Sequence, residues 1–147
     1  MLKVREIKPE MAYDLRHTIL RPHQPFEACI YDTDHDENAF HVGAYYEETL
    51  VSIASFYEEN HPELSSKKQY RLRAMATLPS HRKLGAGRAV VQFAENRISE
   101  KETEILWCMG RTSVQEYYER LGFKPHGEVF DYPPIGPHIV MVKELSR

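Results

Sequence analysis

The sequence predicts an α+β fold, and three observations lead to that prediction. Several segments alternate apolar and polar residues, as half-buried strands do, while others repeat apolar residues at the spacing of an amphipathic helix. These strand-like and helix-like segments are interspersed along the chain. No internal repeat or linker interrupts the 147 residues, a length that can bury roughly two-thirds of its unfolded surface. We therefore expect one domain over residues 1–147.

The first part of the chain predicts a strand and then a helix. The strand is "LKVREI" (2–7), which alternates, and the helix is "PEMAYDLRHTILRP", which keeps near-helical apolar spacing until Pro22 stops it. An irregular stretch over residues 22–38 follows and carries the acidic run "DTDHDE". We interpret that run as a solvated loop, or as a rim that attracts cationic amines.

The middle of the chain predicts a hairpin, a strand and a helix. "FHVGAYYEETLVSIASFYEE" (40–59) reads as two strands around the turn "EET". "YRLRAMATL" (70–78) alternates again and ends at Pro79. Residues 86–101 repeat apolar side chains on one face, as an amphipathic helix does.

The last part predicts a strand, a helix and two further strands. "EILWCMG" (104–110) is typical of a short buried strand. "TSVQEYYERLG" (112–122) has helical spacing, a capping-box pattern at Ser113 and Glu116, and Gly122 where a left-handed residue ends a helix. The remaining residues read as two strands separated by a Pro/Gly loop.

Composition excludes several classes of protein. Hydrophobic residues make up 41% of the chain. The net charge of −3 argues against a nucleic-acid-binding surface, which needs a basic face. Neither a signal peptide nor an apolar run long enough to cross a membrane is present, so we expect a cytoplasmic protein without a membrane partner. Cys29 and Cys108 are expected to be buried free thiols. No His or Cys spacing fits a metal site, so we expect no metal.

The segment "SHRKLGAGRAVV" (80–91) places two glycines before the predicted helix. A helix N-terminus with unpaired N–H groups binds anions, and Arg82, Lys83 and Arg88 add positive charge. A P-loop would need Lys and Ser or Thr after the second glycine, where Arg88 and Ala89 stand. A dinucleotide-binding turn would need a small residue where Val90 stands.

The spacing Arg82-x-x-Gly85-x-Gly87 resembles the acyl-CoA signature [QR]-x-x-G-x-[GA] of the GNAT superfamily of N-acetyltransferases. Downstream, "YYERLGF" resembles that superfamily's second motif, commonly "FYEKLGF", and the order of elements is similar over essentially the whole chain. The resemblance implies a mixed sheet of six to seven strands flanked by helices and splayed between the fourth and fifth. It also implies direct transfer of an acetyl group from acetyl-CoA, as co-substrate, to a primary amine.

The resemblance further implies which residues hold acetyl-CoA. Main-chain groups of the strand before the loop would pair with the pantetheine arm, and the backbone near Ala76 would polarise the thioester carbonyl. Arg111 stands where relatives often carry an asparagine that positions CoA, and it either reaches the cofactor or is an exposed arginine beside a helix cap. The backbone ligands of the pyrophosphate would be Arg82, Lys83, Leu84, Gly85, Ala86, Gly87 and Arg88, and those of the pantetheine Met75, Ala76 and Thr77.

Tyr118 occupies the tyrosine position of the second motif, which implies a general acid for the thiolate leaving group; the structural alternative is a core aromatic. His138 and Glu58 are candidate general bases, each weighed against an ordinary polar role. Two other functions stay open: a non-catalytic CoA-binding sensor, and a transferase with another acyl donor. The acceptor would be a small-molecule or peptide amine, and a homodimer is also left open.

Overall fold

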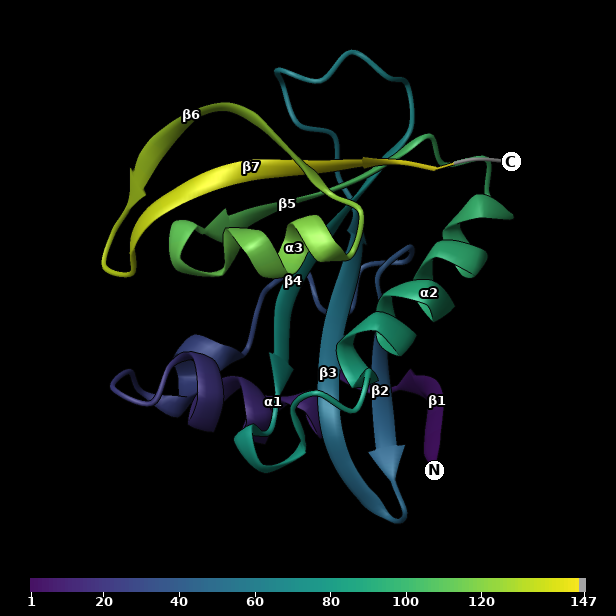
Figure 1. Cartoon of the computed structure of the whole chain (residues 1–147), viewed down its shortest axis with the longest axis vertical. Coiled ribbons are helices and arrows are strands. Elements are labelled where there is room, and N and C mark those ends of the chain that lie inside the picture. The colour runs from purple at the N-terminus through teal and green to yellow at the C-terminus, as the bar shows by residue number, and fades with distance from the viewer. Residues whose placement is uncertain (146–147) are drawn as a thin grey trace.

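A single mixed sheet runs through the computed structural model, which describes residues 1–145 (Figure 1). Its seven strands are β1 (Leu2–Ile7), β2 (Phe40–Tyr46), β3 (Thr49–Glu58), β4 (Gln69–Thr77), β5 (Ile105–Arg111), β6 (Lys124–Tyr132) and β7 (Gly136–Glu144). They lie in the order β1-β2-β3-β4-β5-β7-β6, and within the described residues only β4 and β5 are parallel neighbours. The predicted α+β class and mixed sheet are confirmed.

Within residues 1–145, three α-helices cover the sheet. The helices α2 (Ala86–Ser99) and α3 (Gln115–Arg120) pack on one face, and α1 (Tyr13–Leu15) lies on the other (Figure 1). Short α1 is one turn of a longer helical segment that starts as a 3-10 turn, Pro9–Ala12, and continues as a π-helical turn, Arg16–Leu20. The helix predicted from the N-terminal spacing therefore forms, with an irregular ladder of hydrogen bonds.

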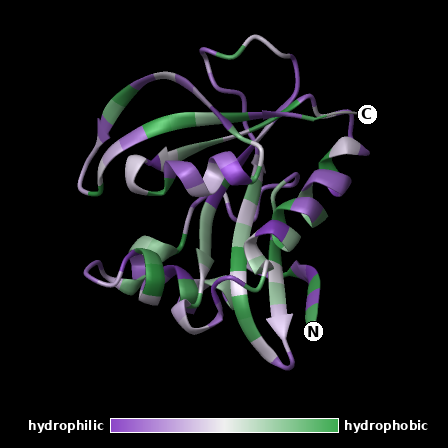
Figure 2. Ribbon diagram, viewed as in Figure 1, coloured by the Kyte–Doolittle hydropathy of each residue, from purple (hydrophilic) through white to green (hydrophobic). Residues whose placement is uncertain are grey.

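The core lies mainly between the sheet and α2. Val90, Ala94 and Ile98 form the apolar stripe of α2 and are fully buried against side chains such as Val42 and Phe56 of the central strands. Burying a Val or Ile side chain completely stabilises a fold by about 1.5–3 kcal/mol, so this stripe holds α2 in place. Figure 2 shows the same pattern, with hydrophobic residues along the central strands and hydrophilic ones on the outer side of α2.

The sheet splits between β4 and β5. These strands pair at only three positions, Gln69 with Ile105, Tyr70 with Leu106, and Arg71 with Trp107, and then diverge. Ala74 has a positive φ of 56°, and the register between β3 and β4 shifts around it, so a bulge bends β4 away from its neighbour. The predicted splay between the fourth and fifth strands is confirmed.

One local prediction about α3 needs correction, and others are confirmed. The predicted capping box does not form, because Val114 is the N-cap of α3 and no side chain caps it; a 3-10 turn, Thr112–Val114, precedes the helix instead. Gly122 has the left-handed φ of 99° that was expected. The irregular segment contains one 3-10 turn, Phe26–Cys29. Both cysteines are buried free thiols, and none of the helices described is long and apolar enough to cross a membrane.

The acidic run "DTDHDE" was expected to be a solvated loop or a rim that attracts amines, but one of its carboxylates is buried. Asp34 is buried beneath the N-terminal helical segment and forms a two-pronged ion pair with buried Arg16, at 2.8 and 3.0 Å. The Tyr57 hydroxyl of β3 donates to the same carboxylate at 2.6 Å. Burial alone would raise the pKa of Asp34, but the hydrogen bonds from Arg16 and Tyr57 outweigh it and hold that pKa below its usual value.

Candidate active site

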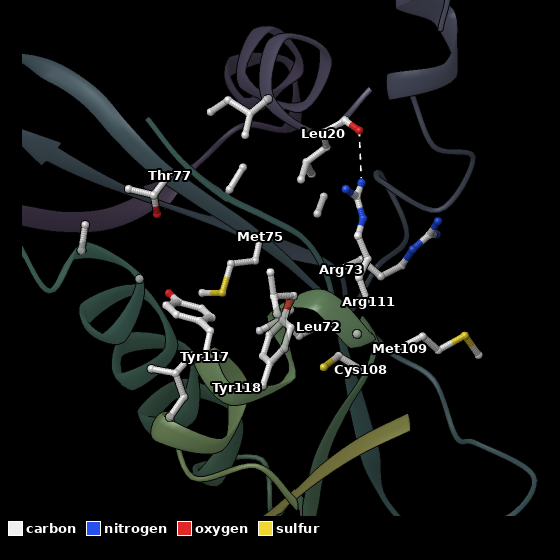
Figure 3. A pocket seen from close by; sticks show the side chains of 18 of the residues that line it. Leu20, Leu72, Arg73, Met75, Thr77, Cys108, Met109, Arg111, Tyr117 and Tyr118 are labelled. Atoms are coloured by element: carbon white, nitrogen blue, oxygen red, sulfur yellow. Dashed lines mark hydrogen bonds between the residues drawn. The ribbon is translucent and has the colours of Figure 1, made fainter. Parts of the chain in front are cut away.

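The split in the sheet opens into a cavity of about 740 Å³. It is bounded by the unpaired parts of β4 and β5, the loop before α2, α3 and the turn between β6 and β7. Figure 3 shows side chains of β4, β5 and α3 that line it. Most residues predicted from the sequence line it: Met75, Ala76, Thr77, Arg82, Lys83, Gly85, Ala86, Gly87, Arg88, Arg111, Tyr118 and His138. The fold thus brings together residues that lie more than 60 positions apart in the chain.

Two predicted residues lie outside this cavity. Glu58 ends β3 opposite Tyr70, where β4 and β5 are still paired, and its carboxylate accepts a hydrogen bond of 2.7 Å from Asn38. The Leu84 side chain is 46% exposed and does not line the cavity. The position of Glu58 does not support the role of general base that the sequence left open.

Gly85, which precedes α2, and Gly87, in the first turn of α2, are required for different reasons. Gly85 is the N-cap of α2 and has a φ of 80°, a conformation that L side chains rarely adopt. A Cβ on Gly85 would meet nothing within 4 Å, so the backbone conformation alone explains this glycine. A Cβ on Gly87 would instead lie 1.9 Å from the Tyr117 hydroxyl oxygen. Gly87 therefore allows α3 to pack closely against α2, a reason that the sequence did not reveal.

The N-terminus of α2 is open to an anion. No side chain caps it, and no acidic residue stands in its first turn. The first N–H groups of a helix lack intrahelical partners and carry the positive end of its dipole. Exposed Arg82 and Lys83 precede this end, and Arg88 follows it and donates to the Arg120 carbonyl at 2.8 Å. Backbone donors and cationic side chains therefore converge at one end of the cavity.

The β4 edge that faces the cavity carries unpaired backbone groups. The Ala76 carbonyl accepts a hydrogen bond from Ser52 of β3, and the Leu78 N–H donates to Val51, so these two residues turn towards β3. Because successive residues of a strand present their backbone groups to opposite edges, Met75 and Thr77 turn towards the gap. The gap can therefore take an extended ligand as an added strand, with Met75 and Thr77 rather than Ala76 as its partners.

Two tyrosines of α3 form the wall opposite β4 (Figure 3). The Tyr118 ring packs edge-on against Phe123 and lies so close to Gly110 that a Cβ there would be 3.1 Å from the ring. Burial, reinforced by Cys108 and Tyr117 nearby, raises the pKa of Tyr118 well above its usual value. Its phenol therefore stays protonated at neutral pH and can donate a hydrogen bond. Burial also raises the pKa of the Cys108 thiol, which disfavours a nucleophilic thiolate there.

His138 of β7 lies beside the end of β5, opposite Arg111 in the register, and is only 4% exposed. Its Nδ1 is 2.9 Å from the Gly136 carbonyl oxygen, which can only accept a hydrogen bond. Nδ1 of the neutral ring therefore carries the proton, and Nε2 keeps its lone pair. The ring also contacts Tyr132, at 4.8 Å between centroids. His138 is thus a cavity residue that can accept a proton.

The cavity is strongly cationic, a property that the sequence did not reveal. Its lining contains seven arginines and one lysine but no aspartate or glutamate among the residues described. Arg71 and Arg73 flank buried Leu72 in β4, and Arg21 comes from the end of the N-terminal helical segment. The strand alternation in "YRLRAM" places both β4 arginines on one face, but only the fold shows that this face borders the cavity.

Known proteins resemble this chain over most of its length. The model of the Acetyltransferase (GNAT) family matches residues 6–123. YitI of Bacillus subtilis (strain 168), described as an uncharacterized N-acetyltransferase, is 48% identical over 145 residues, which cover 99% of this chain and 97% of YitI.

Two solved structures share the fold at low sequence identity. An aminoglycoside 6'-N-acetyltransferase complexed with coenzyme A matches with a TM-score of 0.71 and 17% identity, covering 99% of this chain and 98% of that one. FeeM, an N-acyl amino acid synthase from uncultured soil microbes, matches with a TM-score of 0.76 and 14% identity, covering 99% and 91%.

Proposed function

This chain belongs to the GNAT family of N-acetyltransferases, which use acyl-CoA, and from that premise we propose that it transfers the acetyl group of acetyl-CoA directly to a primary amine bound in the cavity. One observation carries the proposal: the open edge of β4 ends at the uncapped N-terminus of α2 within a single cavity. An extended pantetheine arm needs the first feature, and a pyrophosphate needs the second.

The donor is held mainly by backbone groups in this proposal. N–H groups of Arg82 to Arg88 bind the pyrophosphate, and Met75 and Thr77 pair with the pantetheine. The Met75 N–H faces the gap, so it takes the role of polarising the thioester carbonyl that the sequence assigned to the backbone near Ala76.

The transfer needs a group that takes a proton from the amine and a group that stabilises the departing sulfur. The amine nitrogen attacks the thioester carbonyl, a C–N bond forms, the C–S bond breaks, and the sulfur leaves with the electron pair. His138 Nε2 takes the proton from the amine, and Tyr118 donates a hydrogen bond to the departing sulfur. Because the Tyr118 pKa is strongly raised, this phenol stabilises the thiolate more by hydrogen bonding than by complete proton transfer.

The fold does not select the acceptor. One of the two solved neighbours is an aminoglycoside acetyltransferase and the other an N-acyl amino acid synthase, yet both share this architecture. Aminoglycosides carry several ammonium groups, and no carboxylate lines the described cavity to receive them. We therefore expect this chain to acetylate aminoglycosides poorly.

Calorimetric titration with acetyl-CoA, followed by release of free CoA thiol with a panel of amines, tests this function. We expect saturable binding, weakened in Arg82→Gln/Lys83→Gln, and amine-dependent thiol release. The variant His138→Gln should lower kcat and leave the acetyl-CoA Kd unchanged. Absence of binding at millimolar acetyl-CoA, or faster turnover with succinyl-CoA or palmitoyl-CoA, would contradict the proposal.

A further inference from the structure

The positive charge of the cavity exceeds what the donor's phosphates need. Arg82, Lys83 and Arg88 lie at the N-terminus of α2, where a pyrophosphate would bind, and Arg120 lies beside them through its contact with Arg88. Four further arginines line the rest of the cavity: Arg21, Arg71, Arg73 and Arg111. They do so in a chain whose net charge is −3, so their clustering is local.

These four arginines lie on the α1 side of the split sheet. Leu72 belongs to the core beneath α2, so Arg71 and Arg73, its neighbours in β4, point to the opposite face. Arg111 donates to the Leu20 carbonyl at 3.2 Å, at the end of the N-terminal helical segment. Figure 3 shows Arg73 and Arg111 together, across the cavity from Tyr117 and Tyr118. The group is thus separate from the wall that would hold the donor.

Most of this charge has no acidic partner in the part of the chain that the structure describes. Arg71 pairs with Glu59 at 3.2 Å, but its Nε is buried without a hydrogen-bond partner. No ion pair within residues 1–145 involves Arg21, Arg73 or Arg111. The Arg73 guanidinium lies 4.3 Å from the centre of the Tyr31 ring, which attracts the cation without neutralising it.

Partly buried cations without counter-ions are costly, and a bound anion offsets that cost. An acceptor with only ammonium groups would be repelled by this cluster. An acceptor that also carries an anionic group would be attracted, and guanidinium forks match a carboxylate through two parallel hydrogen bonds. The same cations would lower the pKa of an ammonium held nearby, which eases the loss of the proton before attack.

Building on the acetyl-transfer function above, we propose that the acceptor is an amino acid: an amine whose carboxylate is bound by Arg73 and Arg111, with Arg21 completing the site. Arg71, already paired with Glu59, adds positive charge to the same wall. The carboxylate lies on the α1 side, and the amine points across the gap towards the thioester. Donor and acceptor therefore enter from opposite faces of the sheet and do not compete for the same cations.

Matched acceptors test this inference without changing the protein. The twenty common L-amino acids are compared with their C-terminal amides, with spermidine and with O-phosphoethanolamine, using thiol release at saturating acetyl-CoA. Charge-assisted bidentate pairs are among the stronger polar contacts, so we expect the best amino acid to exceed its amide by at least about 10-fold in kcat/KM. Spermidine should be a poor acceptor.

Variants then locate the carboxylate. Arg73→Gln and Arg111→Gln should each raise the amino-acid KM by about 10-fold or more and narrow the ratio of acid to amide. Arg73→Gln should also leave the acetyl-CoA Kd unchanged. Arg82→Gln should weaken acetyl-CoA binding without altering that ratio. Arg97 provides a matched control, because it lies on α2 and pairs with Glu6 away from the cavity. Arg97→Gln should change neither the amino-acid KM nor the acetyl-CoA Kd.

The outcomes separate this inference from the function on which it rests. Equal rates for acids and amides, or a preference for spermidine or O-phosphoethanolamine, would overturn the carboxylate site and leave acetyl transfer standing. Absence of acetyl-CoA binding would overturn both. If acetyl-CoA binds but no amine is acetylated, titration of amino acids into the CoA-loaded protein decides: saturable binding supports the site, and no binding refutes it.

Discussion

Tyr118 is held in one orientation by its neighbours, because its ring packs between Gly110, Tyr117 and Phe123 on the wall of the cavity. Those contacts involve the ring, so Tyr118→Phe removes the hydroxyl and keeps the packing. We expect kcat to fall about 10²-fold, because a positioned hydrogen-bond donor to the leaving sulfur is lost. The acetyl-CoA Kd, measured by calorimetry, should stay the same. An unchanged kcat would exclude Tyr118 from the chemistry and leave it a packing residue.

Contact between α2 and α3 depends on the absence of a side chain at Gly87. In Gly87→Ala the new Cβ would overlap the Tyr117 hydroxyl, so we expect the free energy of unfolding to fall by about 1–3 kcal/mol in urea. Adding Tyr117→Phe should recover much of that loss, because the nearest remaining ring atom would be 3.3 Å away. Gly85→Ala, which costs about 1–2 kcal/mol through its positive φ, is the control. If Tyr117→Phe raises the free energy of unfolding of Gly87→Ala and of Gly85→Ala by the same amount, the packing explanation is wrong.

The sequence predicts elements whose cause is local and fails where the cause is a distant contact. The apolar stripe of α2 repeats within 14 residues, so periodicity identifies it. The Gly87–Tyr117 contact joins residues 30 positions apart, and neither residue signals the other. The splay of β4 from β5 was expected only through family resemblance, because the bulge at Ala74 has no glycine to mark it. Likewise, the capping box predicted at Ser113 does not form, because Ser113 lies inside a 3-10 turn and α3 starts only at Gln115.

At the scale of the whole molecule, the N-terminal third forms one wall of the cavity and is fixed to the sheet by buried polar contacts. Arg16 reaches the Cys29 carbonyl at 2.8 Å and the Ser55 hydroxyl at 2.8 Å, in addition to Asp34. His41 of β2 bonds to the same Ser55 hydroxyl at 2.7 Å. This network joins the π-helical turn, the irregular segment and two strands. Arg21 directly follows the π-helical turn, and the Leu20 carbonyl at the end of that turn accepts a hydrogen bond from Arg111, so the network helps to position both arginines.

The stability of the molecule should consequently depend on the ionisation of Asp34. Its pKa is lowered in the folded state, so its contribution is present above the unfolded value of about 4 and is lost as the pH falls through the folded value. We expect Asp34→Asn, which leaves Arg16 without its counter-ion, to lower the free energy of unfolding at pH 7 by about 3–5 kcal/mol. Urea unfolding between pH 7 and 3 measures this, and the difference between wild type and variant should shrink below pH 4. Asp36→Asn, at an exposed position of the same run, should stay within about 0.5 kcal/mol of wild type. A difference that is constant with pH would mean that Asp34 acts through shape rather than charge.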